Sequence, residues 1–225
     1  MINTLKHHLQ SNDDSQLIDI IFSLHNRSYK DDQRVLWKPS DYAFDLIARS
    51  ESLKIPSIYL FSPLREYIAS CSKEKRTEWI KNRADYNKII KYFNLSESEV
   101  DISNTAIQAT LYWCYFAKKV NDLSFKNNIL ALNSNSLLNN PHIVDKVGAH
   151  LKLKKKFNVF KKRNIKKLLT TYSKTDDYKF DKDSRTKQLN KIINDNIKDI
   201  EKAEKLAEII LNCQIKDFKF KKEII

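Results

Sequence analysis

The chain contains a single glycine, Gly148, among its 225 residues. Glycine takes positive φ without steric cost and allows the backbone to approach a phosphate closely. Phosphate-cradling P-loops and dinucleotide-binding fingerprints each need several glycines. Both motifs are therefore excluded. Because glycine is so scarce, we also expect few positive-φ turns and a helix-rich chain.

The length and the net charge of the chain limit the classes of protein to which it can belong. A chain of 225 residues fits one large domain or two small ones, and we expect a single domain over residues 1–225, with residues 1–13 frayed. Lys and Arg outnumber Asp and Glu by 41 to 28, which gives a net charge of +13. The codons for Lys, Asn and Ile are AT-rich, so this excess is only a weak indication of a polyanionic partner.

The sequence favours a cytoplasmic protein that contacts no membrane and binds no metal. No apolar run approaches the roughly 20 residues that span a bilayer, and the first four residues lack the layout of a signal peptide. Cys71, Cys114 and Cys213 show no CxxC spacing, which favours buried reduced thiols over disulfides or a metal site. The histidines offer no metal-ligand spacing either.

Three short apolar segments predict a parallel sheet. They are residues 34–38, 57–61 and 128–132, and each precedes turn residues and then apolar residues at helical spacing. Nearly continuous apolar strands are typical of parallel sheets that are buried on both faces. The predicted fold class is therefore α/β, helix-rich, with a small parallel sheet of about three strands covered by helices.

Longer helical patterns account for most of the remaining chain. Helices are predicted over residues 14–25, 77–92 and 105–120, with a basic helical segment over 150–170 and a C-terminal helix over 183–213. Polar residues at 96–99 and 173–183 predict loops.

Several segments resemble bacterial sulfotransferase-like proteins of the P-loop fold. Residues 35–40 (VLWKPS) and 58–70 (IYLFSPLREYIAS) are similar to the middle of that family, and residues 131–153 and 172–208 are similar to its later parts. The resemblance extends over nearly the whole chain from about residue 14. It implies a partial sulfotransferase-like fold, in which Gly148 allows close packing of a late helix. It also implies transfer of a sulfuryl group from phosphoadenosine phosphosulfate to a hydroxyl acceptor.

The chain departs from the family at two phosphate-binding elements. The family holds the 5′-phosphosulfate with an N-terminal strand, loop and helix rich in Gly, Ser and Thr, and nothing before Lys38 is similar to this element. The family grips the 3′-phosphate with an Arg at a strand exit, where this chain has Phe61. A phenylalanine cannot donate hydrogen bonds to phosphate. We therefore expect an incomplete or inactive sulfotransferase-like protein.

The resemblance assigns candidate site residues. Lys38 would stabilise charge on the bridging oxygen, and Ser40 or Asp41 stands where a His base is frequent; alternatively, Lys38 is a strand-end lysine that reaches water. Ser70 or Ser72 would contact the 3′-phosphate of phosphoadenosine phosphosulfate, the donor, and no covalently bound cofactor is expected. Residues that would attract the anionic donor are Lys154, Lys155, Lys156, Lys161 and Lys162.

The same basic stretch supports a second class of function. Residues 152–167 carry nine Lys or Arg side chains, and no acidic residue lies between Asp145 and Asp176. Such a stripe binds nucleic acid or another polyanion through counterion release, although a solvated helix face has the same composition. The alternative is therefore a non-enzymatic basic binding protein. A third option is a protein-interaction module that uses exposed aromatic side chains of the helix around Trp113.

Overall fold

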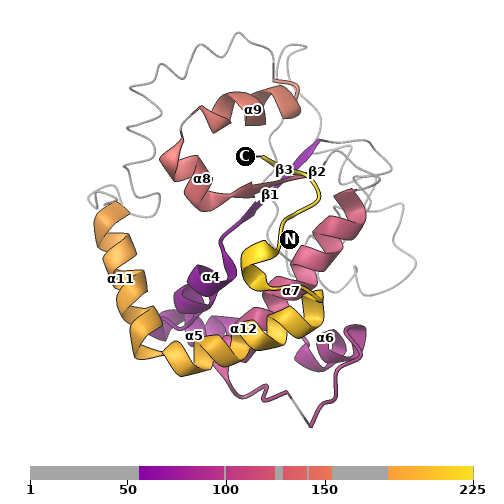
Figure 1. The fold of residues 1–225 in the computed structure, drawn as a ribbon, viewed down its shortest axis with the longest axis vertical. Coiled ribbons are helices and arrows are strands. Elements are labelled where there is room, and N and C mark those ends of the chain that lie inside the picture. The colour runs from indigo at the N-terminus through magenta and orange to yellow at the C-terminus, as the bar shows by residue number, and fades with distance from the viewer. Residues whose placement is uncertain (1–55, 99, 125–128, 141, 154–181, 225) are drawn as a thin grey trace, which may run out of the picture. The chain divides into compact units, whose positions relative to one another are not determined.

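The computed structural model describes residues 56–98, 100–124, 129–140, 142–153 and 182–224 (Figure 1). Internal contacts group Ile58–Ile225 into one compact unit, distinct from Met1–Ser57. The segments predicted at 14–25 and 34–38, and most of the basic segment 150–170, lie outside the described residues. The single-domain organisation stays a prediction.

Short strands and helices follow one another along the described chain. In order they are β1 (Ser57–Phe61), α4 (Leu64–Cys71), α5 (Glu74–Lys81), α6 (Tyr86–Tyr92), α7 (Thr105–Ser124), β2 (Ile129–Asn133), α8 (Ser134–Asn139), α9 (Ile143–His150), α11 (Lys182–Asp195), α12 (Ile197–Leu211), the 3-10 turn η2 (Ile215–Asp217) and β3 (Glu223–Ile224). The prediction of a helix-rich α/β chain with a small parallel sheet is confirmed. The finer sulfotransferase-like assignment remains a proposal.

The sheet has the strand order β1-β2-β3, so that β2 lies in the centre. Strands β2 and β3 are parallel, with Leu132 opposite Ile224, and the Ala131 N–H donates to the Lys222 carbonyl over 2.8 Å. Two predicted strands are confirmed, at 57–61 and, with a shift of one residue, at 129–133. Strand β3 was not predicted, because two residues are too few to show an alternating pattern.

An aromatic cluster joins the C-terminal segment to the sheet. The Phe220 ring lies 4.5 Å from Phe61 and 5.7 Å from Tyr59, measured between centroids. Phe218 packs edge-on against Trp113 at 5.4 Å. Phe61 occupies the position where the resembled family has a phosphate-binding Arg, and here its ring is in contact with the aromatic cluster.

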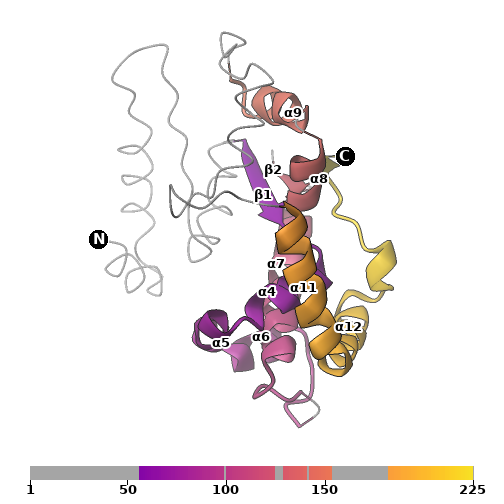
Figure 2. The same cartoon turned by 90° about the vertical axis from the view of Figure 1, so that its left-hand side faces the viewer.

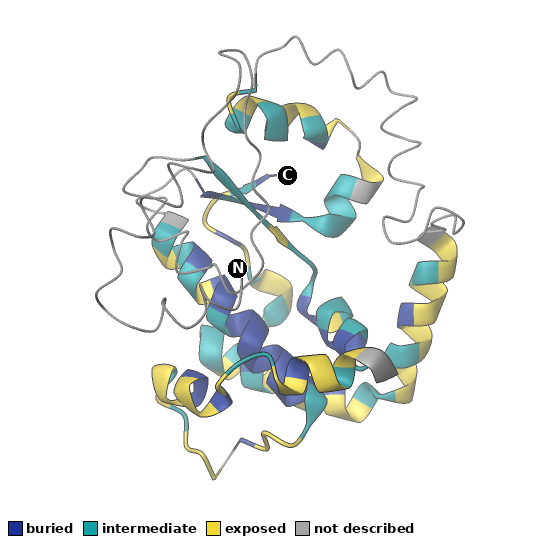
Figure 3. Ribbon diagram, turned by 180° about the vertical axis from the view of Figure 1, so that it is seen from behind, coloured by how far each residue is buried: buried dark blue, intermediate teal, exposed yellow. Residues whose placement is uncertain are grey.

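Helix α7 forms the centre of the core. All its residues from Ala106 to Cys114 are buried, and Figure 3 shows buried residues concentrated along it. A helix that is buried on all sides is typical of a core element. Trp113 is only 5% exposed, so the ring that defined the predicted interaction surface of this helix lies in the core.

Two predicted helices are each divided into two. The pattern over 77–92 forms α5 and α6, which are separated by residues 82–85, and the Asp85 side chain accepts from the Lys88 N–H to cap α6. The pattern over 183–213 forms α11 and α12, with Asn196 between them. The Asn196 amide donates to the Ile192 carbonyl over 2.8 Å. Asparagine competes in this way for helical backbone groups, which favours a helix end.

The chain makes its left-handed turns without glycine. Positive φ occurs at Asn94, Lys152 and Asn212, with values of 54°, 54° and 52° among the described residues. Gly148 lies inside α9, and a Cβ placed on it would meet nothing within 4 Å. The expectation that Gly148 permits close packing is therefore wrong for the described part of the chain.

Replacing Gly148 with Ala should stabilise the protein. A helical glycine loses more backbone entropy on folding than alanine, and the site has room for the methyl group, so we expect a gain of about 0.5–1 kcal/mol. Thermal unfolding should show a Tm higher by about 1–4 °C. The matched control is Ala149→Gly in the same helix, which should lower Tm by a similar amount. A lower Tm for Gly148→Ala would contradict the open space at this position.

Replacing Phe220 with Ala should destabilise the protein strongly. Phe220 is 5% exposed, and loss of a buried phenylalanine ring costs roughly 3–5 kcal/mol. Urea unfolding measures this loss. The control, Ile209→Ala, removes a side chain that is 69% exposed and should change stability by less than about 0.5 kcal/mol. Equal effects of the two changes would show that the aromatic cluster does not hold the C-terminal segment.

Candidate functional site

The structure describes two of the predicted site residues, Ser70 and Ser72. Both lie at the C-terminal end of α4, Ser70 within its last turn and Ser72 as its C-cap. The other candidates, Lys38, Ser40, Asp41 and the lysines Lys154, Lys155, Lys156, Lys161 and Lys162, lie outside the described residues.

The two serines differ in their hydrogen bonds. The Ser72 hydroxyl donates to the Ile68 carbonyl of its own helix over 3.0 Å. The half-buried Ser70 hydroxyl accepts a hydrogen bond from the guanidinium Nη1 of Arg76. Ser70 is therefore the serine that lies in a cationic environment, whereas Ser72 caps α4.

Cationic side chains from three segments gather around Lys73, and one of them, Arg76, donates to Ser70. Lys73 lies in the turn after α4 and Arg76 in the first turn of α5, while Arg185 comes from α11, which packs beside α4 (Figures 1 and 2). The Lys73 Nζ donates to the Gln188 Oε1 of α11 over 2.9 Å. We call Ser70, Lys73, Arg76, Arg185 and Gln188 the Ser70 cluster.

The cluster concentrates positive charge. Partial burial, and after it the nearby Arg76 and Arg185, lower the pKa of Lys73 below its ordinary value. Neither Lys73 nor Arg76 has an ion-pair partner among the described side chains. Mutual repulsion of this kind is relieved when an anion binds between the cations.

The groups of the cluster suit a phosphate or sulfate group. A guanidinium donates two parallel hydrogen bonds to such an anion, and an ammonium contributes a compact charge. The hydroxyl of Ser70 and the amide of Gln188 are neutral groups able to donate further hydrogen bonds. The arrangement can therefore bind an oxyanion.

Sequence reasoning identified Ser70 but missed its neighbours. Arg76 follows Ser70 by six residues, so its proximity depends on how the chain turns between α4 and α5. Arg185 and Gln188 are more than 100 residues away from Ser70 in sequence. Only the packing of α11 against α4 brings them to the site.

A second polar group lies at the carboxyl ends of the strands. Ser62 follows β1, Ser134 follows β2, and their hydroxyl oxygens are 3.1 Å apart. The Asn135 amide donates to the Glu66 carboxylate over 2.6 Å. Ligands often bind at this edge of a parallel sheet, but here the described polar groups bond to one another.

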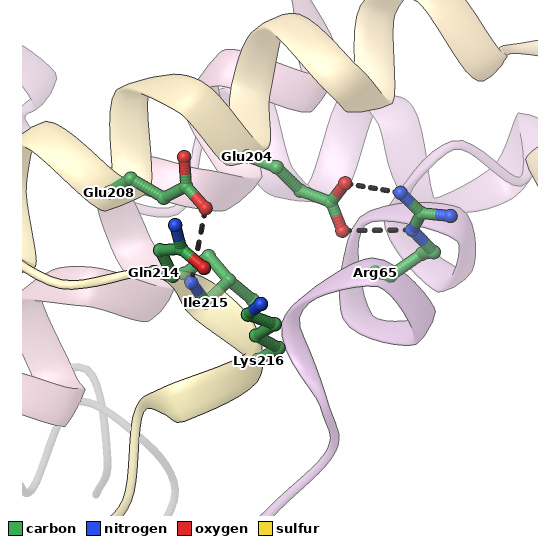
Figure 4. A pocket seen from close by; sticks show the side chains of 6 residues that line it. All are labelled: Arg65, Glu204, Glu208, Gln214, Ile215 and Lys216. Carbon is green, nitrogen blue, oxygen red and sulfur yellow. Dashed lines mark hydrogen bonds and ion pairs between the residues drawn. The ribbon is translucent and has the colours of Figure 1, made fainter.

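An open pocket of about 470 Å³ lies where α4 meets α12 and η2 (Figure 4). Arg65 donates to both carboxylate oxygens of Glu204, and this hydrogen bonding raises the pKa of Arg65. Glu208 accepts from the Ile215 N–H over 3.2 Å. Gln214 and Lys216 complete the lining. These charged groups join α12 to α4 and to η2, so we assign the pocket a structural role.

The cysteines are free thiols. Cys71 and Cys114 are buried and Cys213 is partly exposed, so the predicted burial is confirmed for the first two. Burial raises the pKa of Cys71 to about 11 and also raises that of Cys114. Protonated thiols of this kind are poor nucleophiles.

The described residues contain neither a group of metal ligands nor a membrane-spanning helix. No three His, Cys, Asp or Glu side chains there are grouped as ligands for a metal ion. Within the same ranges, no helix has the length and apolar character required to cross a membrane.

Comparison with known proteins gave no match: no family model, no curated protein and no solved structure is similar to this chain. The resemblance to sulfotransferase-like proteins thus depends on the sequence segments quoted above and on no independent relative.

Replacing Lys73 with Gln should stabilise the protein at low ionic strength. The change removes repulsion from Arg76 and Arg185, while a glutamine amide can still donate to Gln188. Because the group is largely solvated, we expect a rise in Tm of only about 1–3 °C. The rise should disappear at high salt, where charge interactions are screened.

The control for this change is Lys81→Gln, an exposed lysine at the end of α5. Its Tm should not respond to salt in the same way. A Tm for Lys73→Gln that falls equally at low and high salt would indicate that Lys73 acts only through its bond to Gln188, and that the cluster carries no net repulsion.

Proposed function

We propose that the chain binds a phosphate-bearing nucleotide at the Ser70 cluster, as a sulfotransferase-like protein that does not transfer the sulfuryl group by itself. The observation that supports this function is the hydrogen bond from Arg76 to Ser70, the serine assigned to the 3′-phosphate, with Lys73 and Arg185 nearby.

The exchange of Arg for Phe at position 61 is compatible with this proposal. Phe61 contacts Phe220 in the aromatic cluster, so it contributes to packing. Arg76, in the first turn of α5, supplies a guanidinium to Ser70 at the C-terminal end of α4. The charge that the family brings from the strand exit would come here from α5, with a second guanidinium from α11.

Sulfuryl transfer itself would need groups beyond the cluster. In the proposed reaction the S–O bond to the donor phosphate breaks, a new S–O bond to the acceptor oxygen forms, and the acceptor proton passes to a base such as Asp41. Lys38 would stabilise the charge that develops on the bridging oxygen. Residues 1–37 contain no segment similar to the Gly/Ser/Thr-rich loop that holds the phosphosulfate in that family, and the proposal is therefore one of nucleotide binding at the Ser70 cluster.

The alternative is a non-enzymatic basic protein that binds nucleic acid or another polyanion. It is supported by the net charge of +13 and by the acid-free basic run over residues 152–167. A general polyanion binder and the proposed nucleotide site differ in one respect. Only the nucleotide site requires Arg76 in particular, since a diffuse positive field loses little when one of many cations is removed.

Adenosine 3′,5′-bisphosphate should stabilise the protein against unfolding. A ligand at about 100 times its Kd adds about 2.7 kcal/mol to the stability, which a thermal shift assay detects readily. Arg76→Ala removes a charge-assisted hydrogen bond worth roughly 1.5–3 kcal/mol and should weaken binding about 10- to 150-fold. Isothermal titration measures this change directly.

The matched control is Lys81→Ala, which removes a positive charge at the other end of α5 and should leave the affinity within about twofold. No thermal shift at millimolar nucleotide would refute the proposed function. Equal losses in Arg76→Ala and Lys81→Ala would favour the general polyanion binder.

A further inference from the structure

Helix α11 is attached to the rest of the described fold by little apolar burial. It packs against α4 and α12, yet of its residues 183–195 Leu189 alone is buried. In α7, by contrast, every residue from Ala106 to Cys114 is buried, and Figure 3 shows this difference between the two helices. Segments with few buried apolar contacts open locally with a small change in free energy. Helix α11 has the features of such a segment.

The polar contacts of α11 with the corner between α4 and α5 involve the Ser70 cluster. The Lys73 Nζ of this corner donates to the Gln188 Oε1 of α11 over 2.9 Å. Arg185 lies one turn before Gln188, so both side chains are on the same face of α11. Arg185 is close enough to Lys73 to lower its pKa, after the effects of burial and of Arg76. A cation of α11 therefore approaches two cations of the corner.

Like charges at this junction oppose the docking of α11 on α4. An anion placed among them replaces repulsion with attraction. A phosphate group can accept hydrogen bonds from Arg76 and Lys73 on one side, and from the guanidinium or amide donors of α11 on the other. A ligand that needs groups from two elements binds best when the elements are together, and it therefore stabilises their association.

We propose that α11 is a strap that closes on the Ser70 cluster when a phosphate group of the nucleotide binds there, and that opens more readily when none is bound. This inference rests on the proposed nucleotide binding and adds a form of regulation to it. The linkage is reciprocal, so any contact that draws α11 away from α4 lowers the affinity for nucleotide by the same factor.

The test is hydrogen–deuterium exchange of the intact chain with and without adenosine 3′,5′-bisphosphate. At about 100 times Kd, exchange of the amides in residues 183–190 should slow by about 10- to 100-fold, because the ligand favours the docked helix. Adenosine, which carries no phosphate, should leave this exchange unchanged. The exposed turn at residues 101–103 lies outside the cluster, and its exchange should be equal under all conditions.

Two changes at Gln188 should act in opposite directions on the nucleotide-free chain. Gln188→Glu places a carboxylate beside Lys73, so exchange in α11 should slow by about 2- to 5-fold. Gln188→Ala removes the hydrogen bond from Lys73 and should speed the exchange by about 2- to 10-fold. Gln188→Glu should also weaken binding of the bisphosphate at least about threefold, because the carboxylate repels the phosphate. Gln188 is exposed, so neither change affects the core.

The matched control is Lys187→Ala. It removes a positive charge from the face of α11 opposite to Arg185, since two residues turn a helix by about 200°. Both the exchange of the nucleotide-free chain and its protection by nucleotide should stay within about twofold. Arg185→Ala removes the cation of α11 from the cluster, and the protection of α11 by nucleotide should fall at least about threefold.

The outcomes separate the strap from nucleotide binding itself. Unchanged exchange in α11 on binding, with an affinity that still depends on Arg76, would overturn the strap alone. Absence of binding in calorimetry would overturn both proposals. Equal protection by adenosine would show that the phosphate does not close α11. Effects of Gln188→Glu and Gln188→Ala in the same direction on the nucleotide-free chain would likewise overturn the strap, because charge at the junction would not control the helix.

Discussion

The buried helix α7 is the element on which the rest of the structure depends. Its run from Ala106 to Cys114 has no exposed side, and it packs against α4, α5, α6, α12 and β2. A hydrogen bond connects it to the residue after β1: the Trp113 Nε1–H donates to the Ser62 carbonyl over 2.9 Å. Because Ser62 is the first residue after β1, this bond fixes the point at which the chain leaves the strand and turns towards α4.

The position of the Ser70 cluster follows from that constraint. Helix α4 begins two residues after Ser62 and is held on one side by α7 and on the other by α11. Its far end therefore presents Ser70 at a place where α11 can contribute Arg185 and Gln188. The bond between Arg65 and Glu204 adds a further restraint from α12 (Figure 4). Three helices distant in sequence thus support one short helix that carries the candidate site.

Local sequence signals predicted the elements whose ends are set locally. Pro63, among the turn residues after the predicted strand 57–61, is the N-cap of α4. Helix α8 was not predicted, because its residues 134–136 have the composition of a turn. Where tertiary packing decides, the sequence was insufficient: the two-residue strand β3 and the approach of Arg185 to Lys73 both need contacts between distant segments. Of the candidate site, the sequence alone therefore provided one serine, and packing provided the cations around it.

Strand β3 has a consequence for the order in which the protein folds. Leu132 of the central strand β2 can pair with β3 only after Ile224 has been synthesised, about 90 residues later. Until then β2 has an open edge, and Tyr59 and Phe61 lack the Phe220 ring that packs against them. Helices α4 to α7 are complete much earlier and can pack while the chain is still being made. The sheet is therefore the last part of the described fold to be completed, and its unfinished edge is the part of the nascent chain most in need of protection from other strands.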